Sequence, residues 1–299
     1  MEFEAFQPRT RVLFTADNFG RSIRDNQAVI RAFQEGVLGA ASLAGRAWAR
    51  DNAVALAREN PGLAVGLQLV LWNGMSALKP SEIHGLVDQR FEFPKGLLGT
   101  HLRYLLNARL RAPLQSEISA QIRLFRSTGL PMAFVAGRGG FQSHPVVASL
   151  LARYQVEWQI PIVRTHYDPL LTNLRIFPFR SLPHLFCGWL MKRFDRHSRP
   201  ILTAAGMVMT DHSLGCLTDR PLNLRYLLRM LEELPPGTYE ICMNPNEDSH
   251  AAELEALTSP ELRRFLSQPG WERITHADLL PAPPPGGATH PSGGAVRID

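Results

Sequence analysis

Cysteine is scarce in this sequence, which holds three widely separated residues, Cys187, Cys216 and Cys242. An odd number of cysteines without close spacing argues against a disulfide framework and against a thiolate zinc site. The chain starts Met-Glu-Phe-Glu-Ala, without a basic and then apolar signal, and no apolar run is long enough to span a bilayer. These absences predict a cytoplasmic protein in a reducing compartment.

A strong charge of either sign is also absent. The formal net charge is +5 and the sequence pI is about 9.4, which is only mildly basic. No motif of interleaved basic and aromatic residues accompanies it, so we expect no nucleic-acid partner. With 299 residues, of which 45% are hydrophobic and 20% charged, the composition is that of a globular protein forming one α/β barrel or two smaller domains.

Stretches typical of strands and helices alternate along the chain. Short apolar runs predict strands at residues 11–16, 36–43, 63–70, 131–136, 160–164, 207–209, 239–243 and near 273. Helical patterns lie between them at residues 24–35, 50–60, 116–128 and 223–234, and from Pro145 and Pro260 onward. This alternation predicts an α/β fold with a parallel sheet, and seven or eight units favour a single irregular (β/α) TIM-like barrel.

Two segments stand apart from this alternation. Residues 173–204 form a predicted insertion, in which 173–199 mixes aromatic and aliphatic residues with arginine and lysine. This stretch is either a docking surface for a membrane or a protein, or a lid helix packed on the barrel, and we favour the lid. Residues 281–299 are rich in proline and glycine and predict a disordered tail, which leaves 1–280 for the barrel.

Polar residues follow several predicted strands. Because the carboxyl ends of parallel strands meet at one mouth of a barrel, we expect these side chains to converge there. The alternatives are local: a β-turn for Asp17-Asn18, a helix cap for His144 and a hydrogen-bond network for His212. The full set is Asp17 and Asn18 after the first strand, Gln68 in the third, Gln142 and His144 beyond the fourth, Arg164 and His166 after the fifth, Asp211 and His212 after the sixth, and Asn244 after the seventh.

The glycine run Ala136-Gly-Arg-Gly-Gly140 precedes a helix whose amino end could hold an anion. The run lacks the lysine and the spacing of a phosphate-binding loop, so we favour a simple flexible turn.

Several longer motifs of the chain match those of one known family. Ala16-Asp-Asn-Phe-Gly20 compares with Ala-Asp-Asp-Phe-Gly, and residues 61–71 compare with Pro-Gly-Leu-x-Val-Gly-Leu-His-Leu-Val-Leu. The helix from Glu117 to Pro131, the triplet Thr210-Asp-His212 and the segment 234–245 also fit. In these motifs, over most of residues 10–275, the chain resembles the YdjC-like carbohydrate deacetylases, most closely their hopanoid-biosynthesis-associated branch.

That resemblance implies divalent-metal-dependent hydrolysis of an N-acetyl group on a sugar. A metal held by one carboxylate and two histidines would polarise the amide carbonyl and acidify a water molecule. A neighbouring aspartate would act as base, and a histidine would protonate the departing amine.

The chain departs from the family at the positions that the resemblance gives to the metal. Asn18 occupies the position where the family has a ligating aspartate, and Gln68 and Arg138 occupy the positions of the two ligand histidines. Amide oxygens are weak ligands of divalent cations, and a guanidinium does not ligate at all. We therefore predict no family-type metal site and no cofactor. Asn244 likewise replaces a family histidine, whereas Asp17, His144 and the Asp211-His212 pair are retained.

The favoured hypothesis is a non-catalytic or repurposed deacetylase-like protein that binds a small polar or sugar-like ligand. Asp17 as base and His212 as acid would carry any metal-independent chemistry, and the other binding candidates are Asn18, Gln68, Arg138, His144, Arg164, Asp211 and Asn244. One alternative is an active carbohydrate deacetylase that recruits metal through Asp17, His144 and His212. The other is docking through residues 173–199 to a partner protein or to the inner face of a membrane. A homodimer remains open.

Overall fold

The computed structural model describes residues 9–165, 182–215 and 221–281. Its strands are β1 (Thr10–Phe19), β2 (Ala40–Ala44), β3 (Ala64–Leu69), β4 (Val135–Gly137), β5 (His212–Leu214), β6 (Thr238–Met243) and β7 (Trp271–Arg273). Its helices are α1 (Ile23–Gln34), α2 (Arg50–Glu59), α3 (Leu97–Leu106), α4 (Arg111–Arg126), α5 (Pro145–Arg153), α6 (Gln155–Trp158), α8 (Leu182–Ala204), α9 (Leu224–Glu232), α10 (Ala251–Thr258) and α11 (Pro260–Leu266), and short 3-10 turns include η2 (Arg138–Ser143).

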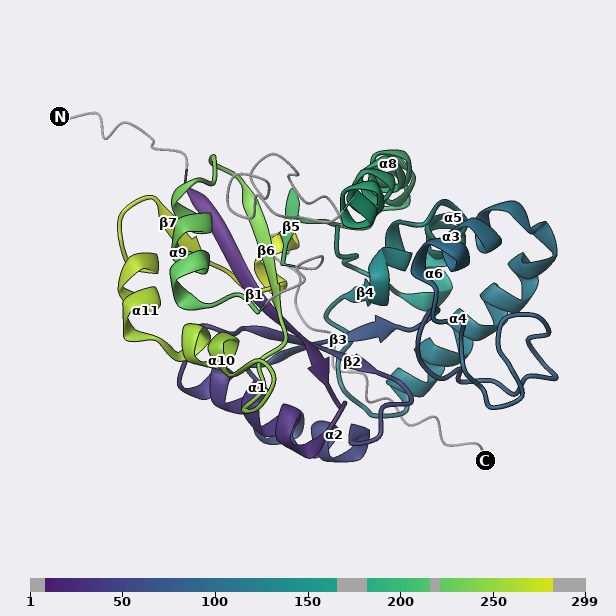
Figure 1. Cartoon of the computed structure of the whole chain (residues 1–299), viewed down its shortest axis with the longest axis horizontal. Coiled ribbons are helices and arrows are strands. Elements are labelled where there is room, and N and C mark those ends of the chain that lie inside the picture. The colour runs from purple at the N-terminus through teal and green to yellow at the C-terminus, as the bar shows by residue number, and fades with distance from the viewer. Residues whose placement is uncertain (1–8, 166–181, 216–220, 282–299) are drawn as a thin grey trace, which may run out of the picture.

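One parallel sheet forms the centre of the molecule. Its strand order is β4-β3-β2-β1-β6-β5, and β7 pairs with the first residues of β1. Figure 1 shows the sheet curled between two groups of helices, with α1, α2, α9, α10 and α11 on one side and α3, α4, α5, α6 and α8 on the other. The predicted α/β barrel-like fold is confirmed, in the form of a half-barrel.

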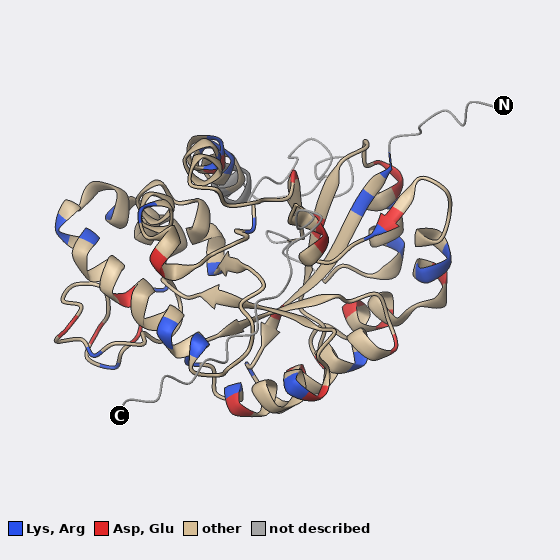
Figure 2. Ribbon diagram, turned by 180° about the vertical axis from the view of Figure 1, so that it is seen from behind, with Lys and Arg blue, Asp and Glu red and all other residues tan. Residues whose placement is uncertain are grey.

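The central strand is β1, which is paired along both edges. The apolar run predicted as a strand supplies Val12, Leu13 and Phe14, all at most 1% exposed. Apolar residues on both faces suit a parallel strand that helices cover on both sides. Figure 2 shows that most charged residues lie on the helices and loops around this sheet.

Two predicted strands are reduced to single bridges. Residues 160–164 and 207–209 contribute only the parallel bridges Val135–Val163 and Ile162–Val208. Pro161 has no N–H to donate, which limits a longer ladder at this point. These bridges extend the sheet beyond β4 without closing the barrel.

Helix α8 occupies most of the predicted insertion, while residues 166–181, including His166, lie outside the described residues. Met191 and Phe194 are buried, and Trp189, Arg193 and Arg196 are exposed. The helix packs against α5 and η2. Within the ranges that the structure describes, no helix is long and apolar enough to cross a membrane. The proline- and glycine-rich stretch 282–299 also lies outside the described residues.

Candidate ligand pocket at the carboxyl end of the sheet

Asp17 and Asn18 lie in an irregular part of β1 near its carboxyl end. The register between β1 and β2 shifts between Ala16 and Phe19. A bulge of this kind twists the strand and re-aims its side chains. As a result, the carboxylate of Asp17 and the amide of Asn18 reach different sets of partners.

Asp17 is paired with a buried arginine. Nη1 of Arg164 donates to both carboxylate oxygens of Asp17 at 2.7 Å, and Nε of Arg164 donates to Glu240 at 2.8 Å. The side chains of Arg164 and Glu240 are 3% and 1% exposed, while that of Asp17 is 21% exposed. Burial, the largest single influence, would raise the pKa of Glu240, but the charge of Arg164 together with His276 and the hydrogen bond from Thr15 lowers this pKa to about 2. Asp17 is thus the outer carboxylate of an ionic triad that reaches into the barrel.

Glu240 and Ser42 belong to this arrangement, and the sequence analysis did not identify either. Glu240 is the only charged residue of β6, and Ser42 is the only polar residue of β2. A charge within an apolar strand needs a buried partner, and this signal could have identified Glu240. Oγ of Ser42 donates to Oδ1 of Asp17 at 2.8 Å. No comparable signal marks a serine in a strand of small residues.

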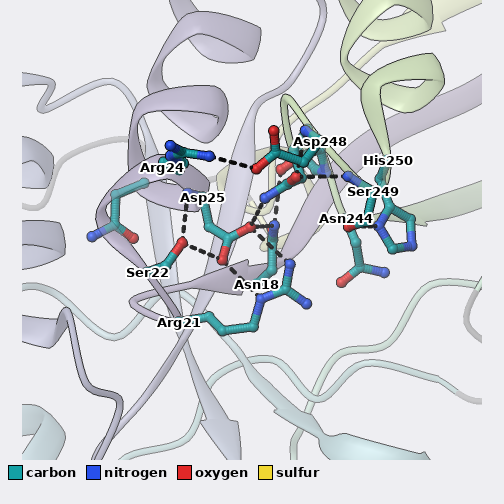
Figure 3. A network of polar contacts seen from close by, with 12 residues as sticks. Asn18, Arg21, Ser22, Arg24, Asp25, Asn244, Asp248, Ser249 and His250 are labelled. Atoms are coloured by element: carbon teal, nitrogen blue, oxygen red, sulfur yellow. Dashed lines mark hydrogen bonds and ion pairs between the residues drawn. The ribbon is translucent and has the colours of Figure 1, made fainter.

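The side chain of Asn18 turns toward the start of α1 (Figure 3). Its Nδ2 donates to Oδ1 of Asp25 at 3.0 Å and to the carbonyl of Pro245 at 2.8 Å. Arg21 also donates twice to Asp25. Burial would raise the pKa of Asp25, but the hydrogen bonds from Arg21, Ser22 and Asn246 and the charge of Arg21 together lower it to about 2. The buried Oδ1 of Asn18 accepts no hydrogen bond from the described residues.

Gln68 connects Asp17 to Arg138. Its Nε2 donates to the backbone carbonyl of Asp17 at 2.7 Å, and its Oε1 accepts from Nη2 of Arg138 at 3.0 Å. Nη1 of Arg138 donates to the carbonyl of Asn73 at 2.9 Å. Burial lowers the pKa of Arg138, and the negative charge of Asp17 opposes that shift. In the described parts of the chain, no carboxylate forms an ion pair with Arg138.

Gly74 leaves room for this guanidinium, and Gly139 forms the turn directly after Arg138. Gly139 has a φ of 65°, and a Cβ at this position would lie 2.7 Å from the side chain of Leu97. A Cβ on Gly74 would lie 2.6 Å from Val70 and 3.2 Å from Nη1 of Arg138. The run 136–140 is therefore a turn that depends on left-handed glycine, in keeping with the turn interpretation.

Helix α4 fixes the loop that follows β3. The backbone N–H groups of Ala77 and Leu78 donate to Glu117 at 2.7 and 3.1 Å. Gln121 accepts from the N–H of Val70 at 2.9 Å and donates to its carbonyl at 2.7 Å. Burial raises the pKa of Glu117, although its hydrogen bonds oppose the shift. These contacts hold the loop in place beside Arg138.

The groups described above surround a cavity of about 450 Å³. This volume is within the range of small-molecule sites. Three arginines line the cavity, and Asp17 is the only carboxylate among its lining residues. Trp48 is 82% exposed and stands at its edge. The lining residues are Asp17, Asn18, Phe19, Arg21, Ala44, Gly45, Arg46, Ala47, Trp48, Gln68, Val70, Asn73, Gly74, Met75, Ala77, Gln121, Arg138 and Asn244.

Asn244 follows β6 and reaches the cavity as expected. Its backbone N–H donates to Glu253, and its side-chain amide, drawn in Figure 3, has no hydrogen-bond partner among the described residues. Arg164 lies one layer deeper and contacts the cavity only through Asp17. Asp17, Asn18, Gln68, Arg138 and Asn244 are therefore brought together.

Asp211 and His212 lie at the other end of the sheet, which corrects the expectation that they converge with Asp17. His212 pairs with Tyr239, which in turn pairs with Val12 near the start of β1. Asp17 lies five positions beyond Val12 along β1, and an extended strand spans about 17 Å over five positions. The reason for the error is a shift of the strand. The sequence analysis placed the strand at 207–209 with Asp211 after it, whereas β5 begins at His212.

His144 is also away from the cavity. It is fully buried, and its Nε2 lies 3.1 Å from the carbonyl of His101. The ring packs among His101, Phe141 and Phe194. Burial lowers the pKa of His144 to about 4, so the ring is neutral at physiological pH. The backbone of His144 precedes α5, in the place that the helix-cap alternative gave it.

Comparison with known proteins identifies the family. The profile of the YdjC-like protein family matches residues 11–268. This chain belongs to the YdjC-like family. A carbohydrate deacetylase of Brevibacillus brevis is 27% identical to this YdjC-like chain over 282 residues, which cover 90% of the chain and 99% of that protein. A carbohydrate deacetylase of Geobacillus stearothermophilus is 30% identical over 167 residues, but that match spans 64% of its length and 55% of this chain.

Solved structures agree with the YdjC-like fold. A protein of Enterococcus faecalis V583, described as a candidate cellobiose-phosphate cleavage protein, superposes with a TM-score of 0.68 at 18% identity. The superposition covers 91% of this chain and 99% of that one. An uncharacterized protein of Agrobacterium tumefaciens C58 superposes with a TM-score of 0.52 at 14% identity, covering 91% and 89%. At these identities the likeness concerns the fold alone.

Proposed function

We propose that this YdjC-like chain binds a small polar, sugar-like ligand in the cavity and does not hydrolyse N-acetyl groups by a metal-dependent route. The observation that carries this proposal is the hydrogen bond from Arg138 to Gln68. The resemblance to carbohydrate deacetylases gives both positions to metal-ligating histidines. In this chain a guanidinium and an amide occupy them and bond to each other.

The donor set at these positions does not fit a divalent cation. Oε1 of Gln68 already accepts from Arg138, and Nδ2 of Asn18 is directed at Asp25 and Pro245. Among the side chains of Asn18, Gln68 and Arg138, only Oδ1 of Asn18 is an oxygen without a donor from the described residues, and a single neutral oxygen is a weak ligand. The fixed positive charge of Arg138 would also repel a cation. Among the described residues, no group of three or more His, Cys, Asp or Glu side chains is placed to hold a metal ion.

The lining of the cavity favours a polyhydroxylated ligand. The side-chain amide of Asn244 has no hydrogen-bond partner among the described residues, and the indole of Trp48 offers an exposed apolar face. A sugar needs this combination of polar groups for its hydroxyls and an aromatic surface for its ring face.

The position of Asp17 argues against metal-independent hydrolysis. Both oxygens of Asp17 accept hydrogen bonds from Arg164, and one also accepts from Ser42. These contacts tie the carboxylate in place. His212, the expected acid, lies near the opposite end of β1, out of reach of any group bound beside Asp17. We therefore favour binding over catalysis.

Metal analysis and deacetylation assays test the proposal together. The purified full-length protein should contain no stoichiometric divalent metal and should not deacetylate N-acetylglucosamine or its oligomers, with or without added Zn²⁺. Stoichiometric metal together with turnover that a chelator abolishes would establish the alternative, an active deacetylase.

A second contact surface is proposed on α8. Trp189 is 55% exposed, and Arg193 and Arg196 are exposed on the same helix. An aromatic residue beside arginines is suited to an anionic membrane surface. This surface is independent of the cavity.

A further inference from the structure

Helix α3 leaves four leucines exposed on one side. Leu98, Leu102, Leu105 and Leu106 recur at helical spacing, and they are between 36% and 79% exposed. The opposite side of the same helix is buried in the fold. Single exposed apolar residues are normal on a protein surface, but a cluster of them marks an interaction site. We call these four residues the leucine face.

The leucine face continues onto α5. Leu105 borders a surface groove together with Val146 and Leu150 of that helix. The charged residues among those that line the groove are Arg111 and Arg153, and both are exposed. Apolar side chains and cations therefore lie side by side on this surface, and no carboxylate is part of the groove lining.

The neighbouring helices α3, α5 and α8 present cations to the solvent. Figure 1 shows α3 beside α5, and α8 packs on α5. The three helices hold six lysines and arginines and one acidic residue, Asp195. Asp195 is 2% exposed and accepts hydrogen bonds from Ser143 and Thr165. Of the lysine, arginine and acidic side chains that the structure describes on these helices, those at the surface are therefore all positive.

Carboxylates occur only outside this surface. The loop before α3 holds Asp88 and Glu92, and Glu92 lies 3.9 Å from Lys95. Glu157 is exposed on α6, the helix that follows α5. None of these carboxylates lines the groove at Leu105. The surface therefore suits a partner that has a negative charge outside and an apolar interior.

We propose that the leucine face docks on an anionic phospholipid membrane, with its leucines in the acyl layer and Arg111 and Arg153 at the headgroup phosphates. A bilayer accepts protruding apolar side chains without a matching pocket, and nearby cations add electrostatic attraction to anionic lipid. A second copy of this chain suits the face less well. Its own leucine face and groove would desolvate the two arginines without offering them a carboxylate.

This inference rests on the same kind of partner as the proposed α8 surface, but on different residues, and it is independent of the sugar pocket. Exposed Trp189 on α8 is an aromatic side chain among arginines, whereas the leucine face supplies aliphatic side chains that leave water on docking. The two surfaces are therefore separable by substitution.

Vesicle sedimentation with leucine variants tests the inference. The full-length wild type should bind vesicles of phosphatidylcholine mixed with phosphatidylglycerol, and bind those of phosphatidylcholine alone much less. Leu102→Ser together with Leu106→Ser should lower the partition coefficient about tenfold or more, because the apolar transfer of both side chains is lost. Both leucines are exposed, so the melting temperature should stay close to that of the wild type. Ile23→Ser with Leu280→Ser, two exposed apolar residues outside these helices, is the matched control and should bind like the wild type.

Two further variants separate apolar from electrostatic contributions. Leu102→Phe with Leu106→Phe keeps the face apolar and should retain binding. Arg111→Gln with Arg153→Gln should lower the partition into anionic vesicles about tenfold, because each basic residue near such a surface contributes to the attraction. Arg263→Gln with Arg264→Gln on α11 is the charge-matched control.

The outcomes distinguish the leucine face from the α8 surface. If the serine variant sediments like its control while Arg193→Gln with Arg196→Gln loses binding, the inference is overturned and the α8 surface stands. The reverse result supports the leucine face alone. If the wild type binds no vesicle, both membrane surfaces are overturned. If it instead forms a dimer that the serine variant converts to a monomer in sedimentation velocity, the face joins two copies and the membrane inference is overturned.

Discussion

Nη2 of Arg138 donates a hydrogen bond to Oε1 of Gln68 at 3.0 Å, across the neighbouring strands β3 and β4. Nε2 of Gln68 in turn donates a hydrogen bond to the backbone carbonyl of Asp17. A cation with a fixed charge thus lies beside the carboxyl end of β1. The resemblance to carbohydrate deacetylases implies a metal ion in this region. We therefore infer that the guanidinium of Arg138 supplies the positive charge that the metal ion would supply.

Restoring the family's ligands should restore metal binding. The triple variant Asn18→Asp, Gln68→His and Arg138→His supplies one carboxylate and two imidazoles and removes the guanidinium, so we expect it to bind Zn²⁺ stoichiometrically. Elemental analysis and calorimetric titration measure this. Arg138→His alone is the control and should stay metal-free. Without metal, the new carboxylate at position 18 would face Asp25, whose Oδ1 is 3.0 Å from Nδ2 of Asn18. We therefore expect zinc to raise the melting temperature of the triple variant. A triple variant without zinc affinity would contradict the placement of the pocket.

Glu240 should make the protein less stable in acid. Its pKa in the folded state is about 2, below the ordinary glutamate pKa of 4.5. A lowered carboxylate pKa stabilises the fold above the unfolded-state pKa, and this stabilisation is lost as the pH falls toward 2. The corresponding part of the free energy of unfolding is on the order of 3 kcal/mol. Denaturant unfolding from pH 6 to pH 2.5 should show the decline.

The variant Glu240→Gln should lose part of that pH dependence. At neutral pH it should be less stable by about 3 kcal/mol, since Arg164 would lose its buried carboxylate partner Glu240. Glu35→Gln removes an exposed carboxylate paired with Arg31 and should change little. Equal pH profiles for Glu240→Gln and the wild type would contradict the ionic triad.

Trp48 should contribute to binding by contacting the sugar ring, whether or not the sugar carries a charge. Trp48→Ala is expected to reduce the affinity for neutral and for anionic sugars by similar factors, about fivefold to tenfold, because it removes an apolar contact. Its 82% exposure means that the fold should tolerate the change. Trp189→Ala, an exposed tryptophan on α8, is the matched control. A loss of affinity confined to the anionic sugars would argue against this role.

The α8 surface is testable with vesicles. The wild type should co-sediment with liposomes that contain anionic phospholipid and much less with neutral ones. Arg193→Gln together with Arg196→Gln should reduce the bound fraction severalfold, because each basic residue near such a surface contributes about 1 kcal/mol. Arg263→Gln with Arg264→Gln on α11 serves as a charge-matched control. Equal sedimentation of both double variants would remove the case for docking through α8.

Much of the site could be predicted from the strand ends. Asp17, Asn18, Gln68, Arg138 and Asn244 follow buried strands or lie within them, and parallel topology brings such positions to one edge. The prediction failed for Asp211 and His212 because the apolar run at 207–209 contributes only a bridge at Val208. A five-residue error in strand position, from 207–209 to His212–Leu214, moved both to the opposite end of the sheet.

Other residues could not be assigned from local pattern. Arg46 and Trp48 lie in the loop after β2, and no periodicity marks them as neighbours of Arg138. His144 was a candidate because it lies near strand-end residues, yet its side chain is enclosed by aromatic rings of α3, η2 and α8. Burial depends on what packs against a residue, and that is a long-range property.

The sequence by itself determined the alternation of strands and helices, the parallel sheet and the family. These features depend on the spacing of apolar residues and on motifs that are contiguous in the chain. The tertiary structure alone decided how the polar groups are paired: Asp17 with Arg164 and Glu240, Gln68 with Arg138, and Asn18 with Asp25. It also decided that Arg46 and Arg138, from different loops, line one cavity. Charges in a fold are matched across strands far apart in the chain, and only the packed sheet brings those strands together.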